Sequence, residues 1–413
     1  MQSNKPSTTI SFSDTIFCSS VHPSKALLAT GLSTGHVFMQ RYAPDDEDNG
    51  EHEIDDSDND EDFNEQEKEV KLFDVKRMWK TRRHKGSCRA LTFDENGNVL
   101  YSVGSDSVLK QASAETGRVI AKSVRDIESE PTALQVTSTH ILVGDENSTL
   151  KLFDPRTVKP THTFTECHDD YITSISHLAQ YQNSYQLITT GSTTVTRIDI
   201  RKGKLLTSED QEDEILCSTI CYPSYFEYNP STGVGVNPDK RVPVIAVMGM
   251  ATGVLTFWEK NNWEDQQSRA KLSDESIDCV AEYPGEKVIA GGADGYVRLL
   301  DARSRKRLRI LEHGGEDGVQ SVSADAFGRI ISTGGEVVKI WNEHDDEEKK
   351  GKEKFSDSDS DDDGEDDSDS DDSDSSDDGK KKKKKKQKKR KRKGKTFTAP
   401  KPSRPKPSFA GLD

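Results

Sequence analysis

The chain has 413 residues, of which 31% are hydrophobic and 32% charged, and its formal net charge is −16 at pH 7. These fractions exclude one compact body of this length, because too little apolar surface is available to offset the entropy of ordering. Three segments concentrate the charge: residues 45–69 hold 15 acidic side chains and one lysine, 355–379 hold 14 acidic side chains, and 380–395 hold 14 Lys or Arg. The remaining parts, about 1–44 and 70–350, are near neutral together, which predicts no broad basic face for nucleic acid.

The six cysteines are scattered, and only Cys217 and Cys221 lie close together in the sequence. This pattern favours core thiols in a reducing compartment over a zinc site or a disulfide framework. The first residues lead to no long apolar run, and no stretch approaches the ~18–20 apolar residues of a membrane span. We therefore expect a soluble intracellular protein without a membrane partner.

The sequence contains neither a Gly-x-x-x-x-Gly-Lys-Ser/Thr phosphate loop nor a His-Glu-x-x-His metal motif. Most clustered carboxylates lie in highly charged segments, which hold neither the geometry nor the pKa of a general base. His84, His168 and His313 fall near the starts of repeated units, where structural hydrogen bonding is expected. We predict a protein that is not an enzyme and uses no cofactor, metal ion or small-molecule substrate.

A short phrase recurs along the chain: an apolar strand that ends in an acidic or amide residue and follows a glycine turn. Three copies end in Asp-x-Arg, at 150–156, 195–201 and 297–303, and two looser copies lie at 254–260 and 338–342. The turn glycines Gly249, Gly292 and Gly335 are 43 residues apart. That spacing is typical of a four-stranded propeller blade of about 40–45 residues.

Seven such units can be phased between residues 8 and 344, and their pattern resembles the WD-repeat β-propeller family. The nearest matches to the family's Trp-Asp pair are Trp258-Glu259 and Trp341-Asn342, and its tight-turn aspartate is present at Asp106, Asp145 and Asp294. The resemblance implies an all-β fold, a seven-bladed WD-repeat β-propeller. Because these motif residues are only partly present, we expect the family's buried His–Ser/Thr–Asp–Trp network to be incomplete in every blade.

The last unit ends at Asn342 without an outer strand, whereas Thr8–Ser13 reads as a strand before the first unit. We predict that this N-terminal strand completes the last blade, because an open sheet edge invites aggregation. In blade one, we expect a third strand at His36–Gln40 and an outer strand at Val70–Val75, with the insert 45–69 between them.

The predicted organisation is therefore a propeller over residues 1–344 that contains a disordered acidic insert at 45–69. A disordered tail follows over 345–413, with a Ser/Asp-rich part at 355–379 and a polybasic part at 380–395.

The complete segregation of charge in the tail predicts a function for the polybasic part, as a nuclear localisation signal or a contact with nucleic acid. No aromatic residue is interleaved, so base-specific recognition is not expected. The candidate residues are Lys380, Lys381, Lys382, Lys383, Lys384, Lys385, Lys386, Lys388, Lys389, Arg390, Lys391, Arg392 and Lys393.

The Ser/Asp-rich part resembles a substrate of acidophilic kinases, because several serines have an acidic residue three positions later. The candidate phosphosites are Ser356, Ser358, Ser360, Ser368 and Ser375. Phosphorylation there would deepen the negative charge and mask the neighbouring basic part.

The Asp-x-Arg endings have two interpretations. They resemble the motif by which some WD-repeat proteins bind a cullin-ring ubiquitin-ligase adaptor; alternatively, Asp accepts turn hydrogen bonds and Arg covers the strand edge. Their recurrence at one blade position favours the structural role, because repeats reuse structural residues. The residues are Asp154, Arg156, Asp199, Arg201, Asp301 and Arg303.

In layout, the whole chain resembles a family of fungal nucleolar WD-repeat proteins named for an interaction with a Jumonji-domain protein and related to an animal nucleolar WD-repeat protein. The resemblance implies a scaffold in the nucleus and nucleolus that acts in large-subunit ribosome biogenesis and rRNA processing. Its expected partners are pre-ribosomal assembly factors, with non-specific rRNA contact through the tail. Two alternatives remain: a substrate receptor of a cullin-ring ubiquitin ligase, and a histone-binding chromatin adaptor whose acidic insert meets basic histone tails.

Overall fold

The computed structural model describes residues 6–44, 73–178, 185–222, 227–229, 234–236, 244–259, 262–314 and 318–342. The chain divides into two units, Met1–Phe355 and Ser356–Asp413, and all of the described residues belong to the first. These residues form seven four-stranded sheets and one two-stranded hairpin, and no helix occurs among them. The predicted all-β, seven-bladed propeller is confirmed, whereas the acidic insert 45–69 and the tail 345–413 lie outside the described residues.

Each blade is one antiparallel sheet, and its strands follow one another from the inner to the outer edge. Blade one has β2 (Ile16–Val21), β3 (Leu27–Leu32), β4 (His36–Pro44) and β5 (Phe73–Arg82), and blade two has β6 (Cys88–Phe93), β7 (Val99–Gly104), β8 (Val108–Ser113) and β9 (Val119–Val124). Blade three has β10 (Pro131–Val136), β11 (Ile141–Asp145), β12 (Leu150–Asp154) and β13 (Lys159–Phe164), and blade four has β14 (Ser174–His177), β15 (Gln186–Thr190), β16 (Val195–Asp199) and β17 (Gly203–Thr207).

The last three blades continue the same order. Blade five has β18 (Ile215–Cys221), β21 (Ile245–Met250), β22 (Val254–Glu259) and β23 (Ser268–Lys271), and blade six has β24 (Ile277–Tyr283), β25 (Lys287–Gly292), β26 (Tyr296–Asp301) and β27 (Arg307–Glu312). Blade seven has β28 (Ser321–Ala324), β29 (Ile330–Gly334), β30 (Val337–Trp341) and β1 (Thr8–Ser11).

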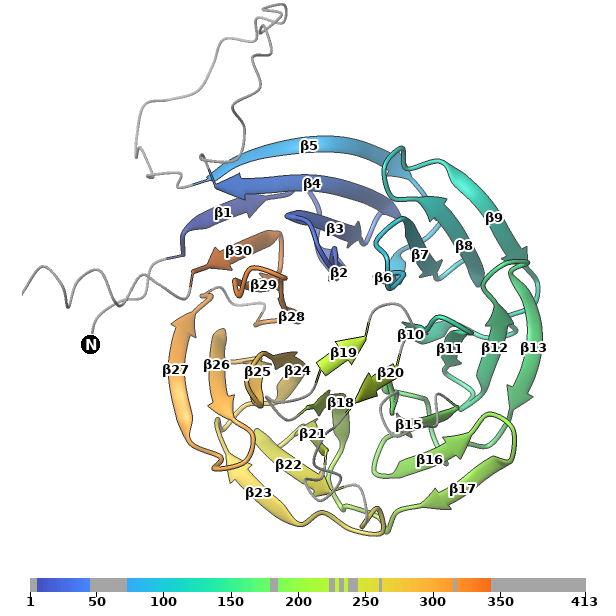
Figure 1. Ribbon diagram of the computed structural model, residues 1–413, viewed down its shortest axis with the longest axis vertical. Helices are drawn as coiled ribbons and strands as arrows, with labels where there is room; N and C mark the ends of the chain where they lie inside the picture. The colour runs from blue at the N-terminus through green and yellow to red at the C-terminus, as the bar shows by residue number, and fades with distance from the viewer. Residues whose placement is uncertain are drawn as a thin grey trace, which may run out of the picture. The chain divides into compact units, whose positions relative to one another are not determined.

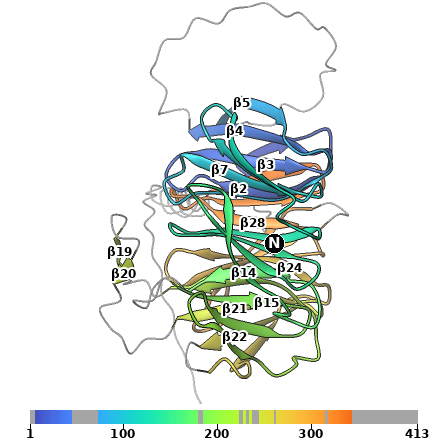
Figure 2. The ribbon, with the colours of Figure 1, turned by 90° about the vertical axis from the view of Figure 1, so that its right-hand side faces the viewer.

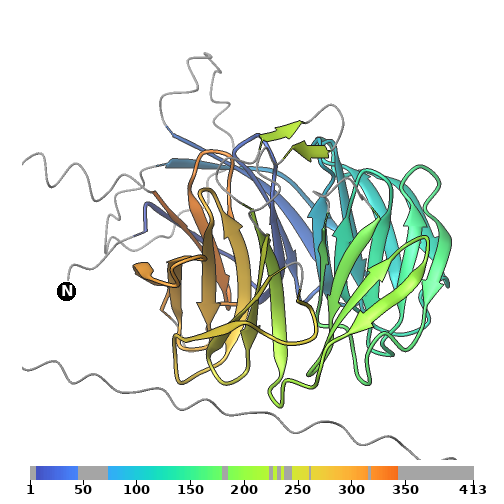
Figure 3. The same ribbon diagram turned by 60° about the horizontal axis from the view of Figure 1, so that its bottom comes forward.

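The blades form a closed ring (Figure 1). Each inner strand contacts the inner strand of the next blade, from β2 through to β28, and β28 contacts β2. Side views show the strands crossing the thickness of this ring (Figures 2 and 3). Only complete closure removes the lateral open faces that a stack of sheets would otherwise expose.

The core lies between adjacent blades. The second strands are almost wholly buried, as in β11 and β21, whereas the outer strand β13 is almost wholly exposed. A buried cluster shows the packing across the closure: Ile331, Val338 and Ile340 of blade seven pack with Leu28 and Tyr42 of blade one. Each blade therefore depends on its neighbours for burial, as expected for a repeat fold.

The N-terminal strand completes blade seven, as predicted. β1 pairs antiparallel with β30, with Thr8 opposite Ile340 and Ser11 opposite Val337. The strand ends at Ser11 rather than at Ser13, although the backbone N–H of Phe12 still donates to the carbonyl of Glu336 at 2.8 Å. Residues near the two ends of the folded region thus share one sheet.

The predicted outer strand of blade one is wrong in its bounds. β4 continues to Pro44, and β5 runs from Phe73 to Arg82 instead of occupying 70–75. Pro44 pairs with Phe73, so the insert joins two adjacent strand ends. The apolar letters at 70–75 suggested a strand, but an outer strand has little need of apolar residues because one edge and much of its surface face solvent.

The segment 222–243 of blade five contains a short hairpin. β19 (Glu227–Asn229) pairs antiparallel with β20 (Val234–Val236), with Tyr228 opposite Gly235. The segment separates β18 from β21, which pair directly with each other. An insertion of this length is accommodated because the two strands that it joins remain paired.

Candidate interaction surfaces

The histidine positions form buried structural networks. In blade two, His84 Nδ1 lies 2.8 Å from Asp106 Oδ1, and its Nε2 lies 2.9 Å from Ser102 Oγ. Burial lowers the pKa of His84 to about 4, against the opposing effect of Asp106, so the ring is neutral at pH 7. Both ring nitrogens are engaged, and this satisfies a polar ring that would otherwise be costly to bury.

Blade four repeats this arrangement without the carboxylate. His168 Nδ1 lies 2.8 Å from Thr194 Oγ1 and its Nε2 lies 2.9 Å from Thr189 Oγ1. Burial lowers the pKa of His168 to about 4. The structural role predicted for this histidine is confirmed.

Blade seven keeps a different part of the network. His313 Nδ1 lies 2.8 Å from Ser332 Oγ, and the indole N–H of Trp341 donates to the same oxygen at 2.9 Å. In blade five the indole of Trp258 donates to Thr256 Oγ1 at 3.0 Å without a histidine. Blade two thus lacks the tryptophan and blade seven lacks the aspartate, so both networks are incomplete, as predicted.

The contacts of Asp106, His84 and Ser102 have the order of a catalytic triad, but His84 and Ser102 are buried, so a substrate has no access to the serine hydroxyl. Residues 31–35 match the Gly-x-Ser-x-Gly letters of hydrolases, which the sequence interpretation overlooked. The first two of these residues end β3 and the other three form the turn to β4, whereas a nucleophile elbow joins a strand to a helix. No group of three His, Cys, Asp or Glu side chains is arranged to hold a metal ion within the described ranges. No helix long and apolar enough to cross a membrane was found there either.

The cysteines behave as core thiols. All six are free, and all except the half-buried Cys18 are buried. Cys18 Sγ and Cys88 Sγ lie 3.8 Å apart across the interface between blades one and two. Burial raises the pKa of the Cys18 thiol well above its ordinary value, which disfavours the reactive thiolate.

The first Asp-x-Arg ending closes the turn between β12 and β13. Asp154 Oδ1 accepts the backbone N–H of Arg156 at 2.8 Å, and these hydrogen bonds lower the pKa of the carboxyl. The guanidinium of Arg156 returns to Asp154 Oδ2 at 3.2 Å, yet its side chain stays 87% exposed. The turn hydrogen bonds therefore account for an aspartate at this position, whereas the Arg156 side chain is accessible to a partner.

The second ending repeats the turn at the end of β16. Asp199 is fully buried, and its Oδ1 accepts the backbone N–H of Arg201 at 3.0 Å. Burial alone would raise the pKa of Asp199, but the hydrogen bonds from Arg201 outweigh it and keep the pKa low. The Arg201 guanidinium carbon lies 4.1 Å from the centroid of the Tyr185 ring, so much of this cation is stacked.

The third ending differs. Asp301 Oδ1 accepts the backbone N–H of Ser304 at 2.5 Å, while the side chain of Arg303 donates to Glu286 at 3.2 and 2.6 Å. All three aspartates thus accept a backbone N–H in the turn after the third strand, two residues on at Asp154 and Asp199 but three residues on at Asp301, and the three arginines have different surroundings. Docking of a ligase adaptor at these turns stays a prediction.

The remaining predicted sites, the polybasic residues 380–393 and the five phosphosites from Ser356 to Ser375, lie outside the described residues. They also stay predictions.

No family model matches the chain. Individual proteins do match: it is 33% identical over 372 residues to the WD repeat-containing protein jip5 of Emericella nidulans, covering 83% of this chain and 86% of that protein. It is 34% identical to the jip5 protein of Botryotinia fuckeliana, covering 81% of this chain and 80% of the relative. The chain belongs to the jip5 family of WD repeat-containing proteins.

A solved structure supports the fold of this jip5-family chain. The crystal structure of the WD40 β-propeller domain of Doa1 superposes with a TM-score of 0.60, covering 82% of this chain and 97% of that domain. The two sequences are only 10% identical, so the likeness concerns the fold alone.

The jip5-family propeller carries a basic strip that the sequence interpretation missed. Lys76, Arg77, Lys80, Arg82 and Lys85 are all exposed along β5 and the residues that follow it. None of these five makes an ion pair within the part of the chain that the structure describes. The dense run of Lys and Arg at 76–85 could have indicated this strip in the sequence. It was overlooked because the net charge of the folded region as a whole is near neutral.

A second surface lies on the inner strands. Phe17 of β2 is 40% exposed, and the guanidinium carbon of Arg89 on β6 lies 5.8 Å from its ring centroid. Arg89 also pairs with Glu130, at 2.5 Å from Nε to Oε1. An exposed aromatic ring with an anchored cation is a composition that protein interfaces favour, and no sequence motif joins these three residues.

Proposed function

We propose that this jip5-family protein is a non-catalytic scaffold of the nucleus and nucleolus that acts in large-subunit ribosome biogenesis and rRNA processing. The observation that carries the proposal is the combination of a closed propeller with the polybasic segment 380–395. The ring offers rigid surfaces for assembly factors, because its blades are packed on both sides. The propellers of WD-repeat relatives are generally non-catalytic protein-interaction modules, and this supports the absence of an enzyme activity.

The polybasic segment would supply localisation and a non-specific grip on rRNA. Contacts between Lys or Arg and phosphate release counterions, so the affinity falls steeply with salt and carries little sequence information. The exposed strip along β5 and the residues that follow it offers five further cations of the same chemistry. Specificity would then come from protein partners on the propeller.

Depletion of the protein tests this role. Sucrose gradients and rRNA-precursor measurements should show fewer free large subunits and an accumulated precursor, and normal levels of both would contradict the proposal. Rescue with a chain in which the Lys and Arg of 380–393 are replaced by Gln should leave the protein outside the nucleolus. Rescue with Arg118→Gln and Lys122→Gln, which removes two exposed cations at the outer edge of blade two, should be normal.

A ubiquitin-ligase substrate receptor is the second candidate, and the 87% exposure of Arg156 favours it. In that case a cullin-ring adaptor should co-purify with the protein, and Arg156→Ala should abolish its recovery. Arg303→Ala is the companion test, although Glu286 already holds that side chain. Affinity purification with mass spectrometry separates the two candidates, because one predicts assembly factors and the other a ligase adaptor.

A further inference from the structure

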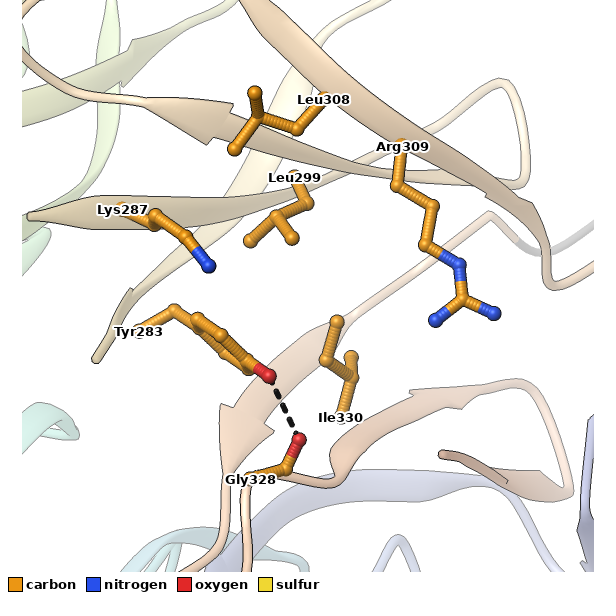
Figure 4. Close-up of a pocket in the computed structure, with 7 residues that line it drawn as sticks. All are labelled: Tyr283, Lys287, Leu299, Leu308, Arg309, Gly328 and Ile330. Atoms are coloured by element: carbon orange, nitrogen blue, oxygen red, sulfur yellow. Dashed lines mark hydrogen bonds between the residues drawn. The ribbon is translucent and has the colours of Figure 1, made fainter. Parts of the chain in front are cut away.

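A small groove lies between blades six and seven (Figure 4). Its volume is about 210 Å³. Residues from β24 to β29 line it, namely Tyr283, Lys287, Leu299, Leu308, Arg309, Gly328 and Ile330. The groove is smaller than the ~300–1,000 Å³ of sites for drug-sized ligands, and its size suits one side chain of a larger partner.

The floor of the groove is apolar and fixed. Tyr283, Leu299 and Ile330 are each less than a tenth exposed, and the Tyr283 hydroxyl donates to the carbonyl of Gly328 at 2.8 Å. This hydrogen bond joins blade six to the turn between β28 and β29. Leu308 lines the same groove and is 51% exposed, so its apolar surface adjoins the floor. The floor therefore favours a bulky apolar group, which would also cover Leu308.

The walls are cationic. Lys287 Nζ lies 5.3 Å from the centroid of the Tyr283 ring, and Arg309 borders the groove from β27. Arg309 Nη1 donates to the carbonyl of Asn342 at 2.9 Å, so its guanidinium is held toward blade seven. Figure 4 shows both cations beside the apolar floor.

The positive charge continues along the surface. Arg305, Lys306 and Arg307 are exposed at the start of β27 and in the turn before it. Asp301 lies opposite Lys287 in the sheet, and Glu286 pairs with Arg303. This side of the groove therefore carries both signs of charge, with positive charge in excess. An apolar cavity with cations on its rim is complementary to an apolar side chain with acidic neighbours.

We propose that the groove between blades six and seven binds a short acidic peptide of a partner protein, with one bulky apolar side chain seated on the floor. The flanking carboxylates of the peptide would pair with Lys287 and Arg309. A nucleic-acid backbone fits less well, because its phosphates would leave the apolar floor uncovered. The proposal concerns what the groove recognises and does not depend on a role in ribosome biogenesis.

The rival occupant is the chain's own acidic segment. Glu343-His344-Asp345-Asp346-Glu347-Glu348 follows Asn342 directly in the sequence, and three residues span at most about 10 Å. That segment supplies carboxylates but no bulky apolar side chain for the floor. It is therefore a competitor for the cations and a distinct outcome of the test.

Fluorescence anisotropy with the full chain tests the proposal. The probe is fluorescein-labelled Gly-Asp-Asp-Phe-Asp-Asp-Gly, compared with one peptide in which Phe is replaced by Ala and another in which each Asp is replaced by Asn. Both substituted peptides should bind at least about tenfold more weakly than the probe, because one loses the anchor and the other the charge. The affinity of the probe should fall as salt rises.

Substitutions in the groove should give the same losses. Leu308→Asp, and Lys287→Ser combined with Arg309→Ser, should each weaken the probe by about tenfold or more. The controls lie in blade two. Ile120 of β9 is 62% exposed, so Ile120→Asp matches Leu308→Asp. Arg118, directly before β9, and Lys122 within it are exposed, so Arg118→Ser with Lys122→Ser matches the paired loss of cations. Circular dichroism melts establish that each variant is folded.

The competitor is tested by a chain in which the five acidic residues of 343–348 are changed to Gln or Asn. If the native segment competes, this chain binds the probe more tightly than the wild type does. The proposal is overturned if neither chain binds the probe, if all three peptides bind equally, or if the β9 variants lose as much affinity as the groove variants. A peptide of residues 343–348 that binds as well as the probe would assign the groove to the chain itself.

Discussion

The closing strand β1 offers a sharp test of how the ring is held together. Ile10 lies in the middle of this strand, is 7% exposed, and belongs to a buried cluster with Leu28 and Phe38 of blade one and Ile340 of blade seven. The substitution Ile10→Ala would remove three carbons from this cluster. It leaves the backbone pairing of β1 with β30 available.

The magnitude follows from burial. Truncation of a buried Ile to Ala costs about 2–5 kcal/mol, because transfer free energy is lost and a cavity remains. The site lies at the outer strand of a blade and can relax partly, so we expect about 3 kcal/mol. For a domain of this size each kcal/mol lowers Tm by roughly 2 °C or somewhat more, so Tm should fall by roughly 6 °C. Deletion of residues 1–14 also removes the strand pairing and should lower Tm further.

Thermal melts followed by circular dichroism and by tryptophan fluorescence measure this effect. Ser11→Ala is the matched control, because Ser11 lies on the same strand with an exposed side chain. Its Tm should stay within about 1–2 °C of the wild type. If Ile10→Ala melted together with Ser11→Ala, the strand would contribute little to closure and the reasoning would be refuted.

Three further predictions concern the scaffold. Burial lowers the pKa of His168 to about 4, so the unfolded chain takes up a proton before the folded chain does as pH falls. The free energy of unfolding should therefore decline between about pH 6.5 and 4, by on the order of 1–2 kcal/mol per buried histidine at pH 5. In urea titrations at several pH values, His168→Asn should make this decline with pH less steep. Gly253→Ala should destabilise the protein far more than Gly203→Ala, although both glycines have positive φ. A Cβ at Gly253 would lie 2.3 Å from two carbonyl oxygens, whereas nothing lies within 4 Å of a Cβ at Gly203. Equal melting temperatures of the two variants would contradict this. Asp199→Ala should lower the free energy of unfolding by about 1–2 kcal/mol, because it removes a buried hydrogen-bond acceptor of the turn, and Arg156→Ala should lower it by less than about 0.5 kcal/mol. Denaturant midpoints measure both effects. A larger loss for Arg156→Ala would mean that the arginine, not the aspartate, holds the turn.

Periodicity in the sequence was sufficient to predict the blades and their closure. The turn glycines and apolar runs repeat because each blade buries the same two inner faces against its neighbours. The outer strand of blade one was predicted with the wrong bounds because β5, at Phe73–Arg82, is rich in Lys and Arg and lacks an apolar alternation. Burial does not constrain an exposed edge strand, so its sequence carries little signal.

The surfaces were harder to predict than the fold. The roles of the buried histidines followed from their position in each repeat. The groove between blades six and seven brings Tyr283 together with Ile330, and the inner-strand surface brings Phe17 together with Arg89. Such neighbours depend on the lateral packing of blades, which local sequence patterns do not encode.

The recurring Asp-x-Arg ending shows how a repeat separates structure from function. Its aspartates each accept a backbone N–H in the turn that follows, whereas the arginines differ: Arg156 returns to Asp154, Arg201 stacks on an aromatic ring and Arg303 pairs with Glu286. A partner that recognised all three arginines would need equivalent guanidiniums, and these differ in exposure, from 87% at Arg156 to 46% at Arg303. The repeat itself is therefore scaffold. A partner that docks through this motif must therefore recognise a single copy. Arg156 is the most exposed of the arginines, so its substitution decides whether a partner binds there.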